Sequence, residues 1–387
     1  MRIRGQIRSH RALKRKIIAP WIVATVATIV TITVVSTGFY FVVRKPCSGQ
    51  LTATIAAAPS NATVIEKVAR EWLEGQPVVN GHCASVDVEP QDSASMVDAL
   101  GQPWNAKSGG APPDAWIPDS SVWVRRAALN PAIAKMFPDS QPSLARSVSV
   151  IAMPRPMAQA LGWPKAQLTW STLINEVAPA GWAHYGKPEW GPVRIGMSDP
   201  TKSTAGLLAL VSIAGADAGG RPIGPGLATI NRLKQTRAVL SPTTDNMIAD
   251  LAKGDRQGVA AVVSYLSAFP ALETDVLAYN QPNPNVPLVA IYPSDGSVDC
   301  DNPYLILRAP WADPTRQKVA QAFLSYARGA NGRRAYLEAG FRTSNRSPGK
   351  GITADNGLTA KLTTPERPTP AVETVSQILT VWTGSTS

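Results

Sequence analysis

The sequence predicts an α/β fold of two lobes that follows an N-terminal transmembrane helix. Short apolar strands alternate with amphipathic helices from residue 51 to about residue 206, which is typical of α/β units with parallel strands. The 387 residues are 44% hydrophobic and 17% charged, so the chain is long enough for two lobes and can bury a sizeable core. Residues 17–43 carry no charge at all.

That uncharged stretch predicts a single membrane span. Its 27 residues exceed the roughly 20 that cross the hydrocarbon layer as a helix. Trp21 near one end and the aromatic residues 39–41 near the other fit the two interfacial belts. Seven basic residues in the tail 1–16 place the N-terminus in the cytoplasm and the main domain outside the cell membrane. The alternative is a cleaved signal peptide, whose apolar region is shorter, roughly 7 to 15 residues.

The net charge of +11 belongs mainly to the N-terminal region. Nine of the 38 Lys and Arg residues lie within residues 1–45, which leaves 29 bases against 27 acids in the remainder. A nearly neutral domain does not indicate a nucleic-acid-binding surface, so we expect no nucleic acid as a partner and expect contact with the membrane through the N-terminal helix.

The cysteines fit an oxidising exterior, in which disulfides persist. Cys47 and Cys83 each precede a strand-like run, so parallel neighbouring strands would bring the two thiols together in a disulfide. Cys300 is left over, and an alternative is that all three are buried thiols. We expect no metal site, because no Cys-x-x-Cys occurs and the exterior part contains only His82 and His184.

The first half of the exterior part alternates strands and helices. A strand over 51–58 leads into a helix whose apolar face would contain Ile65, Val68, Ala69, Trp72 and Leu73. The pattern then predicts a strand at 84–90, a helix at 95–101, a strand at 114–120 and a helix at 121–129. Trp116 and Trp123 lie among apolar neighbours, which favours core positions over sugar platforms.

The second half repeats this alternation of strands, polar turns and helices, with longer connections. A strand and polar turn at 193–206 precede an apolar helix at 207–216, and residues 258–269 are expected to form a strand that enters another polar turn. The runs 147–156, 287–293 and 303–310 are strand-like and suited to crossing between lobes. Helices are expected at 316–329, 332–341 and 371–382, and the Pro- and Gly-rich part of 346–370 is expected to be irregular.

Polar turns at the strand ends predict the ligand-binding site. In open α/β sheets ligands gather at the carboxyl ends of strands, where the unpaired N–H groups of helix N-termini bind polar groups. For each single residue the alternative is an ordinary helix cap. The candidates are Ser60, Asp119, Ser120, Ser121, Ser203, Thr204, Ser264 and Tyr265, with Tyr292 as an outer candidate.

Motifs for catalysis are absent from the sequence. It contains no G-x-x-x-x-G-K-[ST], no H-E-x-x-H, no G-x-S-x-G and no G-x-G-x-x-G after a strand. We therefore expect a protein that is not an enzyme and that has no cofactor. A carboxylate pair for glycoside hydrolysis stays open as an alternative, because its spacing is a three-dimensional property.

The order of these segments resembles type II periplasmic solute-binding proteins, in which two α/β lobes close on a ligand. The resemblance rests on DPTKSTAG before an apolar helix, on ADLAKGDRQGVAAVVSY and on YPSDGSVDCDNPYLIL followed by RRAYLEAGFR. It implies lobe one at 48–155 and 287–345, lobe two at 156–286, and a C-terminal flank with a terminal helix at 346–387.

A closer likeness is to actinobacterial membrane-anchored proteins in which such a module precedes a von Willebrand factor A domain. AAAPSNATVIEKVAREW, DAWIPDSSVWVRRA, VIAMPRPMAQALGWP and PTPAVETVSQILTVWT are similar to that group, but no D-x-S-x-S motif is present. The expected function is capture of a small polar solute, with a transporter or a von Willebrand factor A protein as a further partner. The alternative is an envelope sensor or scaffold of the same fold that binds a protein.

Overall fold

The computed structural model describes residues 28–33, 47–105, 110–215 and 221–384. The chain divides into two compact units, Met1–Ser48 and Gly49–Ser387. In the first unit residues 28–33 are helical, and Ile29, Val30 and Ile32 are exposed. The basic tail and most of the predicted membrane span at 17–43 lie outside the described residues, and none of the described helices is long and apolar enough to cross a membrane.

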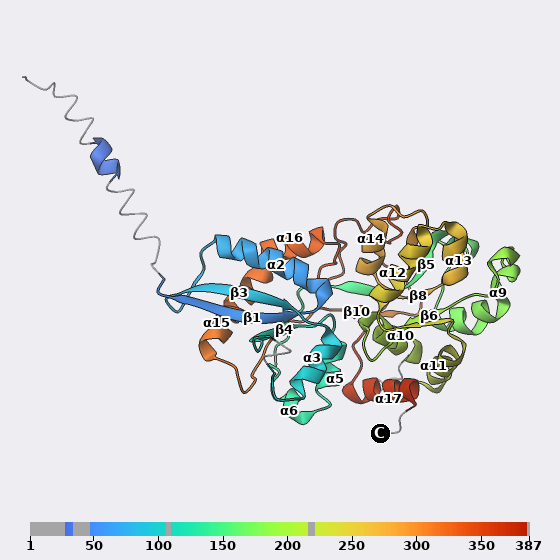
Figure 1. The fold of residues 1–387 in the computed structure, drawn as a ribbon, viewed down its shortest axis with the longest axis horizontal. Coiled ribbons are helices and arrows are strands. Elements are labelled where there is room, and N and C mark those ends of the chain that lie inside the picture. The colour runs from blue at the N-terminus through green and yellow to red at the C-terminus, as the bar shows by residue number, and fades with distance from the viewer. Residues whose placement is uncertain (1–27, 34–46, 106–109, 216–220, 385–387) are drawn as a thin grey trace, which may run out of the picture. The chain divides into compact units, whose positions relative to one another are not determined.

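The second unit begins with the sheet of the first lobe (Figure 1). Its strand order is β11-β4-β1-β3-β2, in which β1 runs parallel to β3 and β4. The strands are β1 (Gln50–Ala57), β2 (Val78–Val79), β3 (His82–Pro90), β4 (Ala115–Ile117) and β11 (Leu305–Ile306). Its helices are α2 (Pro59–Glu74), α3 (Ser93–Leu100), α5 (Ser121–Ala127), α6 (Pro131–Ala134), α15 (Pro314–Ala327) and α16 (Ala330–Glu338).

Alternating side chains of β1 bury both faces of this sheet. Ala53, Ile55 and Ala57 pack with residues of α2, α15 and α16, whereas Ala56 belongs to a core with residues of α3 and α5. This two-sided burial explains why the last residues of β1, Ile55 to Ala57, are all apolar, as in parallel strands covered on both faces. Trp116 and Trp123 are fully buried in the second of these cores, as the sequence predicts.

The second lobe is built around β5, which pairs antiparallel with β8, β9 and β10. Its strands are β5 (Ser147–Pro154), β6 (Gly196–Ser198), β7 (Val239–Ser241), β8 (Phe269–Leu272), β9 (Leu288–Ile291), β10 (Ser297–Cys300) and β12 (Glu366–Arg367). Its helical segments are α7 (Arg155–Ala160), α8 (Trp170–Thr172), a π-helix (Leu173–Val177), α9 (Ala178–His184), a 3₁₀-helix (Pro188–Trp190), α10 (Thr204–Ala214), α11 (Gly224–Thr236), α12 (Thr244–Asp255), α13 (Val259–Tyr265) and α14 (Glu273–Asn280). Helix α10 is its central helix, and every residue of it is buried.

The chain passes between the lobes before β5 and again after β10. Ser143 and Pro303 form a β-bridge there, and the Leu144 amide donates to the Asn302 carbonyl oxygen. A third passage follows α16, where Arg342 pairs with Arg146 and leads into β12 and α17 (Val372–Thr383). Helix α17 packs against α5 of the first lobe and against α10 and α11 of the second, so the C-terminal segment contacts both lobes.

One expectation about secondary structure and one about a buried helix face are wrong. Residues 258–269 do not form one strand, because α13 occupies most of this run and β8 starts only at Phe269. Val262, Val263 and Leu266 are buried while Val259 is 51% exposed, so the apolar residues follow a helical spacing that the sequence's β-branched character obscured. Leu73 is 51% exposed and lies off the buried face of α2.

The predicted disulfide is confirmed. Cys47 and Cys83 are disulfide-bonded, and Cys300 is a free, buried thiol. Gln50 of β1 lies opposite Cys83 of β3 in the parallel register, which agrees with the expectation of neighbouring parallel strands. Burial raises the pKa of the Cys300 thiol well above its ordinary value, so this thiol stays protonated at neutral pH.

Candidate functional site

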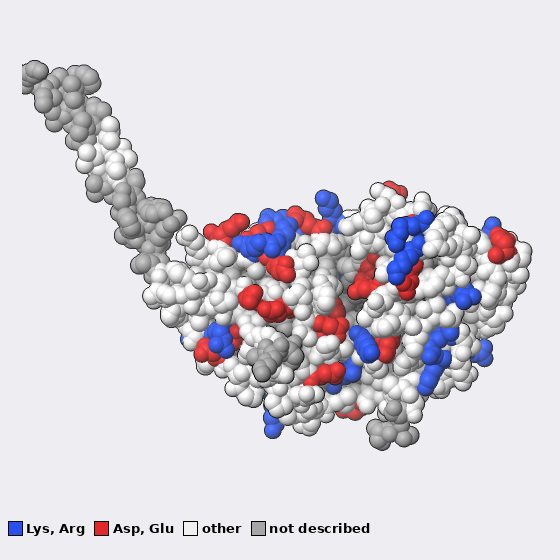
Figure 2. Space-filling model, in the orientation of Figure 1, with Lys and Arg blue, Asp and Glu red and all other residues white. Residues whose placement is uncertain are grey.

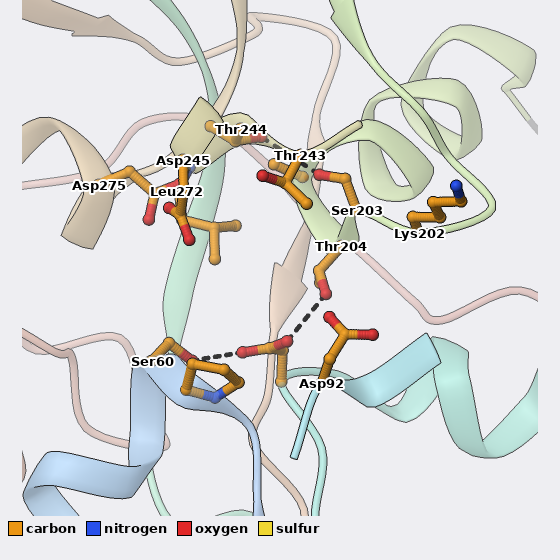
Figure 3. Close-up of a pocket in the computed structure, with 13 residues that line it drawn as sticks. Ser60, Asp92, Lys202, Ser203, Thr204, Thr243, Thr244, Asp245, Leu272 and Asp275 are labelled. Atoms are coloured by element: carbon orange, nitrogen blue, oxygen red, sulfur yellow. Dashed lines mark hydrogen bonds between the residues drawn. The ribbon is translucent and has the colours of Figure 1, made fainter. Parts of the chain in front are cut away.

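A small cavity lies between the two lobes (Figure 3). Its volume is about 100 Å³, enough for several non-hydrogen atoms. Helices α2, α10, α12 and α14 begin at its wall, and α3 contributes its cap residue. The lining residues are Pro59, Ser60, Asp92, Asp119, Lys202, Ser203, Thr204, Ala205, Thr243, Thr244, Asp245, Leu272 and Asp275.

Strand ends and helix caps position these side chains. Ser203 caps α10 by accepting from the Gly206 amide, and Thr243 caps α12 by accepting from the Asn246 amide. Residue 206 must be glycine because α10 approaches β6 closely at this point. A Cβ at residue 206 would lie 2.3 Å from the Ser198 carbonyl oxygen of β6. The absence of a side chain at residue 206 therefore lets α10 start directly against β6 and brings Ser203 to the cavity.

Asp119 is the centre of a hydrogen-bond network in the cavity wall. Its carboxylate accepts from the hydroxyls of Ser60, of Ser93 at 3.1 Å and of Thr204 at 2.9 Å. In Figure 3 the dashed lines from the labelled Ser60 and Thr204 mark two of these hydrogen bonds, which meet at one carboxylate. Burial raises the pKa of Asp119, although the three hydroxyl donors oppose the rise.

The network joins the lobes directly. Thr204 belongs to α10 in the second lobe and donates to Asp119 in the first, and it accepts from Trp123 Nε1 of α5 at 2.8 Å. Arg126 Nη1 of α5 also donates to the Thr201 carbonyl oxygen at 2.6 Å. The cleft is therefore closed in this structure, with its side chains bonded to one another across the lobes.

The other aspartates make the cavity strongly acidic. Asp92 caps α3 by accepting from the Ser95 amide, and Asp275 accepts from the Leu272 amide at 2.8 Å. Burial raises the pKa of Asp275 to about 7, and the neighbouring charges of Asp245 and Asp119 add to the rise. Burial also raises the pKa of Asp245, and the charge of Asp92 adds to it.

The cavity gathers four of the nine predicted ligand-binding residues. Ser60, Asp119, Ser203 and Thr204 line it, and they come from turns far apart in the sequence. Their roles in binding remain predictions, because their position alone does not identify a ligand.

Ser120 and Ser121 lie next to Asp119 but do not line the cavity. Ser120 is fully buried, and its hydroxyl caps α5 by accepting from the Val122 amide at 3.3 Å. Both the amide and the hydroxyl of Ser121 donate to Asp301. In both residues the polar groups are used within the fold, as in ordinary helix caps.

Ser264, Tyr265 and Tyr292 lie away from the cavity wall. Ser264 is exposed and donates to the Ala261 carbonyl oxygen, because it belongs to α13 and not to a strand end. Tyr265 packs at the edge of the apolar cluster of the second lobe. Tyr292 donates to the buried carboxylate of Glu273, which also accepts from Arg342.

Pro59, Lys202 and Ala205 line the cavity as chain neighbours of predicted residues. Six further lining residues are not among the predicted ones or their neighbours: Asp92, Thr243, Thr244, Asp245, Leu272 and Asp275. Thr243–Asp245 follows a short strand in the run SPTTDNM, so the same strand-to-helix signal was present but weak. The strand predicted at 258–269 gives no indication that a helix starts at Glu273, so the sequence did not point to Asp275.

Three of the solved structures that resemble this chain are of proteins described as binding proteins or as bound to a ligand. A periplasmic thiamin binding protein is 12% identical with a TM-score of 0.55, covering 87% of this chain and 95% of that one. The fructose-6-phosphate-bound AfuA of Actinobacillus pleuropneumoniae is 13% identical with a TM-score of 0.53, over 87% and 98%. Iron-bound HitA of Pseudomonas aeruginosa is 12% identical with a TM-score of 0.52, over 86% and 99%. At these identities the likeness establishes the two-lobed fold.

A family model identifies the sequence more directly. No curated protein matches the chain. The model of the bacterial extracellular solute-binding proteins matches residues 53–342, which run from within β1 to just after α16 and contain all the cavity-lining residues. With its two lobes and the cavity between them, the chain belongs to the family of bacterial extracellular solute-binding proteins.

Proposed function

We propose that the protein is anchored in the cell membrane by residues 17–43 and captures a small polar solute between its lobes, without chemical conversion of that solute. The observation that carries the proposal is the interlobe cavity, whose wall contains the starts of four helices and hydroxyl groups from both lobes. Such groups replace the water shell of a polar solute when lobes close around it.

The candidate contacts are those that reach the cavity from the predicted set. Ser60 and Asp119 would bind from the first lobe, and Ser203 and Thr204 from the second. A solute that displaces the hydrogen bond between Thr204 and Asp119 can bind to these two side chains in its place. The entropic cost of ordering them is small, because helix caps and the core already hold them in position. We place the hinge at the two passages before β5 and after β10, so that β5, β9 and β10 move with the second lobe, outside the limits 156–286 expected for it from the sequence.

Thermal unfolding of the full-length chain in detergent tests the proposal. A panel of oxyanions, sugars, amino acids, amines and short peptides is added in turn. A solute at a hundredfold its dissociation constant adds about 2.7 kcal/mol of stability, which raises the melting temperature visibly. A well-folded protein whose melting temperature responds to no class of solute would contradict solute capture.

The membrane anchor has its own test. Cells that express the chain are fractionated and washed with alkaline carbonate, beside cells that express a variant lacking residues 17–43. We expect the full chain to stay with membranes and the variant to be released. Protease added to intact cells or spheroplasts should digest the domain after residue 45 but not the tail 1–16. A full chain released by carbonate would refute the anchor.

A second function is favoured by the closed cleft. Thr204, Asp119, Trp123 and Arg126 already bond across the lobes, so the same fold can serve as a rigid envelope sensor or scaffold for a protein partner. A transporter or a von Willebrand factor A protein, as in the actinobacterial group that the sequence resembles, is the expected partner. Crosslinking in cells followed by mass spectrometry tests it, and a partner retained by a cleft that binds no solute would favour the scaffold.

A further inference from the structure

The charge of the interlobe cavity restricts the class of solute. Asp92, Asp119, Asp245 and Asp275 line it, whereas Lys202 is the only basic residue among its described lining residues. Figure 3 shows Asp245 and Asp275 together on one side of the cavity and Lys202 on the other, and Figure 2 shows acidic side chains around the hollow between the lobes. An anion placed here would be repelled by several carboxylates at short range.

The helix N-termini do not compensate for this charge. Helix starts bind anions through unpaired amides, but at α3, α10 and α12 a side chain of the cavity wall already accepts from one of these amides, whereas α2 has no side-chain cap. Asp92 accepts from Ser95, Ser203 from Gly206, Thr243 from Asn246 and Asp275 from Leu272. The cavity therefore offers mainly hydrogen-bond acceptors, which suit a solute rich in N–H donors.

A second cavity extends the acceptor surface. It has a volume of about 480 Å³, and Asp245 and Asp275 belong to its wall as well as to that of the first. Tyr279 also lines it and is only 6% exposed, and its buried hydroxyl has no hydrogen-bond partner in the described structure. A buried hydroxyl without a partner is rare in native proteins, so this one marks a place where a bound group or a water can complete the hydrogen bonding.

We propose that the solute is an organic amine or guanidinium compound, whose cationic group binds between Asp245 and Asp275 and whose second polar group reaches Tyr279. The assignment rests on the proposed function and gives it a substrate class. None of the described lining residues of the interlobe cavity is aromatic, so this wall does not favour a quaternary ammonium, which lacks N–H donors and is bound by aromatic faces.

Proton competition gives the proposal a distinctive pH dependence. The pKa of Asp275 is about 7, and the charged groups around the two cavities are Asp92, Asp119, Asp245 and Lys202 on the interlobe side with Asp255 and Arg256 on the other. Below pH 7 a cation must displace the Asp275 proton, so its affinity falls by up to about tenfold per pH unit. An Asp275→Asn variant has no such proton to displace and should lose most of this slope.

Isothermal titration of the full-length chain in detergent tests the assignment. The probes are 1,4-diaminobutane, spermidine and agmatine, with choline, inorganic phosphate, glucose and Mg²⁺ as comparisons. We expect at least one of the three amines to bind, and Asp245→Asn and Asp275→Asn to weaken that binding by about tenfold or more. Asp250→Asn is the matched control, since Asp250 lies on α12 as Asp245 does but pairs with Lys253 on the exposed surface.

Tyr279→Phe separates a binding role from a structural one. Removal of an unpartnered hydroxyl should leave the melting temperature of the free protein unchanged or higher, and should still weaken amine binding several-fold. Binding of choline as tight as that of the amines, or of phosphate, glucose or Mg²⁺ in their place, would overturn the amine class and leave solute capture intact. Silence toward every probe and toward the wider thermal panel would overturn solute capture itself.

Discussion

Replacement of Thr204 by Val tests the hydrogen bonds that hold the lobes together. The change keeps the shape of the side chain but removes the hydroxyl that donates to Asp119 and accepts from Trp123 Nε1. Trp123 is fully buried, so its indole N–H would lose its partner without access to water. A buried polar group without a partner costs about 1–3 kcal/mol, which is the loss of unfolding free energy that we expect.

Urea unfolding followed by tryptophan fluorescence measures that loss. Thr236→Val is the matched control, because the Thr236 hydroxyl donates only to the Arg232 carbonyl oxygen at the exposed end of α11. We expect the control to change stability by less than about 0.5 kcal/mol. If Thr204→Val lies within that same margin of the unmodified chain, the interlobe hydrogen bonds do not stabilise the closed form.

Three further predictions concern the buried groups around the site. Glu273→Gln should lower the unfolding free energy by about 3–5 kcal/mol in urea titration, because it leaves the fully buried Arg342 guanidinium without its carboxylate partner. A loss below about 1 kcal/mol would contradict a stabilising ion pair between Glu273 and Arg342. Asp275→Asn should stabilise the protein at pH 8 but not at pH 4. The pKa of Asp275 is raised from 3.8 to about 7 in the folded state, so between these pH values the folded state binds more protons than the unfolded state. The contribution of Asp275 to stability therefore falls as the pH rises from 3.8 to about 7. An equal effect at both pH values would refute the raised pKa. Reduction of the disulfide between Cys47 and Cys83 should cost about 3–4 kcal/mol of stability by the chain-entropy model. The measurement is the thermal midpoint, which should be lower in dithiothreitol than in buffer. An unchanged midpoint would show that the disulfide does not constrain the unfolded chain.

The first lobe was largely predictable from the sequence. The order of strand and helix from β1 to α5 follows from apolar runs that end in cap-competent turns, and parallel pairing of β1 with β3 follows from those units. Leu73 was misplaced because it stands one position beyond Trp72, and a rotation of about 100° per residue carries it from the buried face of α2 to solvent.

The second lobe was less predictable because β-branched residues occur in its helices. In α13 the run from Val259 to Val263 has the composition of a strand, and its burial against α12 decides for a helix. The wrong strand prediction placed Ser264 and Tyr265 among the site candidates, and it gave no indication of Asp275 at the start of α14.

The acidic character of the site was also beyond the sequence reasoning. Asp92, Asp245 and Asp275 each look like ordinary first-turn or capping residues, and no local pattern distinguishes them from other caps. Only the meeting of α3, α12 and α14 at one cavity makes them a single negatively charged surface. The disulfide between Cys47 and Cys83 was easier to predict than the acidic site, because it depends only on the pairing of two neighbouring strands.

Hydrogen–deuterium exchange of the full-length chain, with and without the amine that stabilises it most, tests most directly whether the solute is captured between the lobes. Capture between the lobes predicts protection on binding in the cavity segments 59–62, 119–121, 203–206, 243–246 and 272–276, with the rest of the domain unchanged. Protection confined to other surfaces, such as the loop 343–347 on the first lobe, would contradict capture in the interlobe cavity.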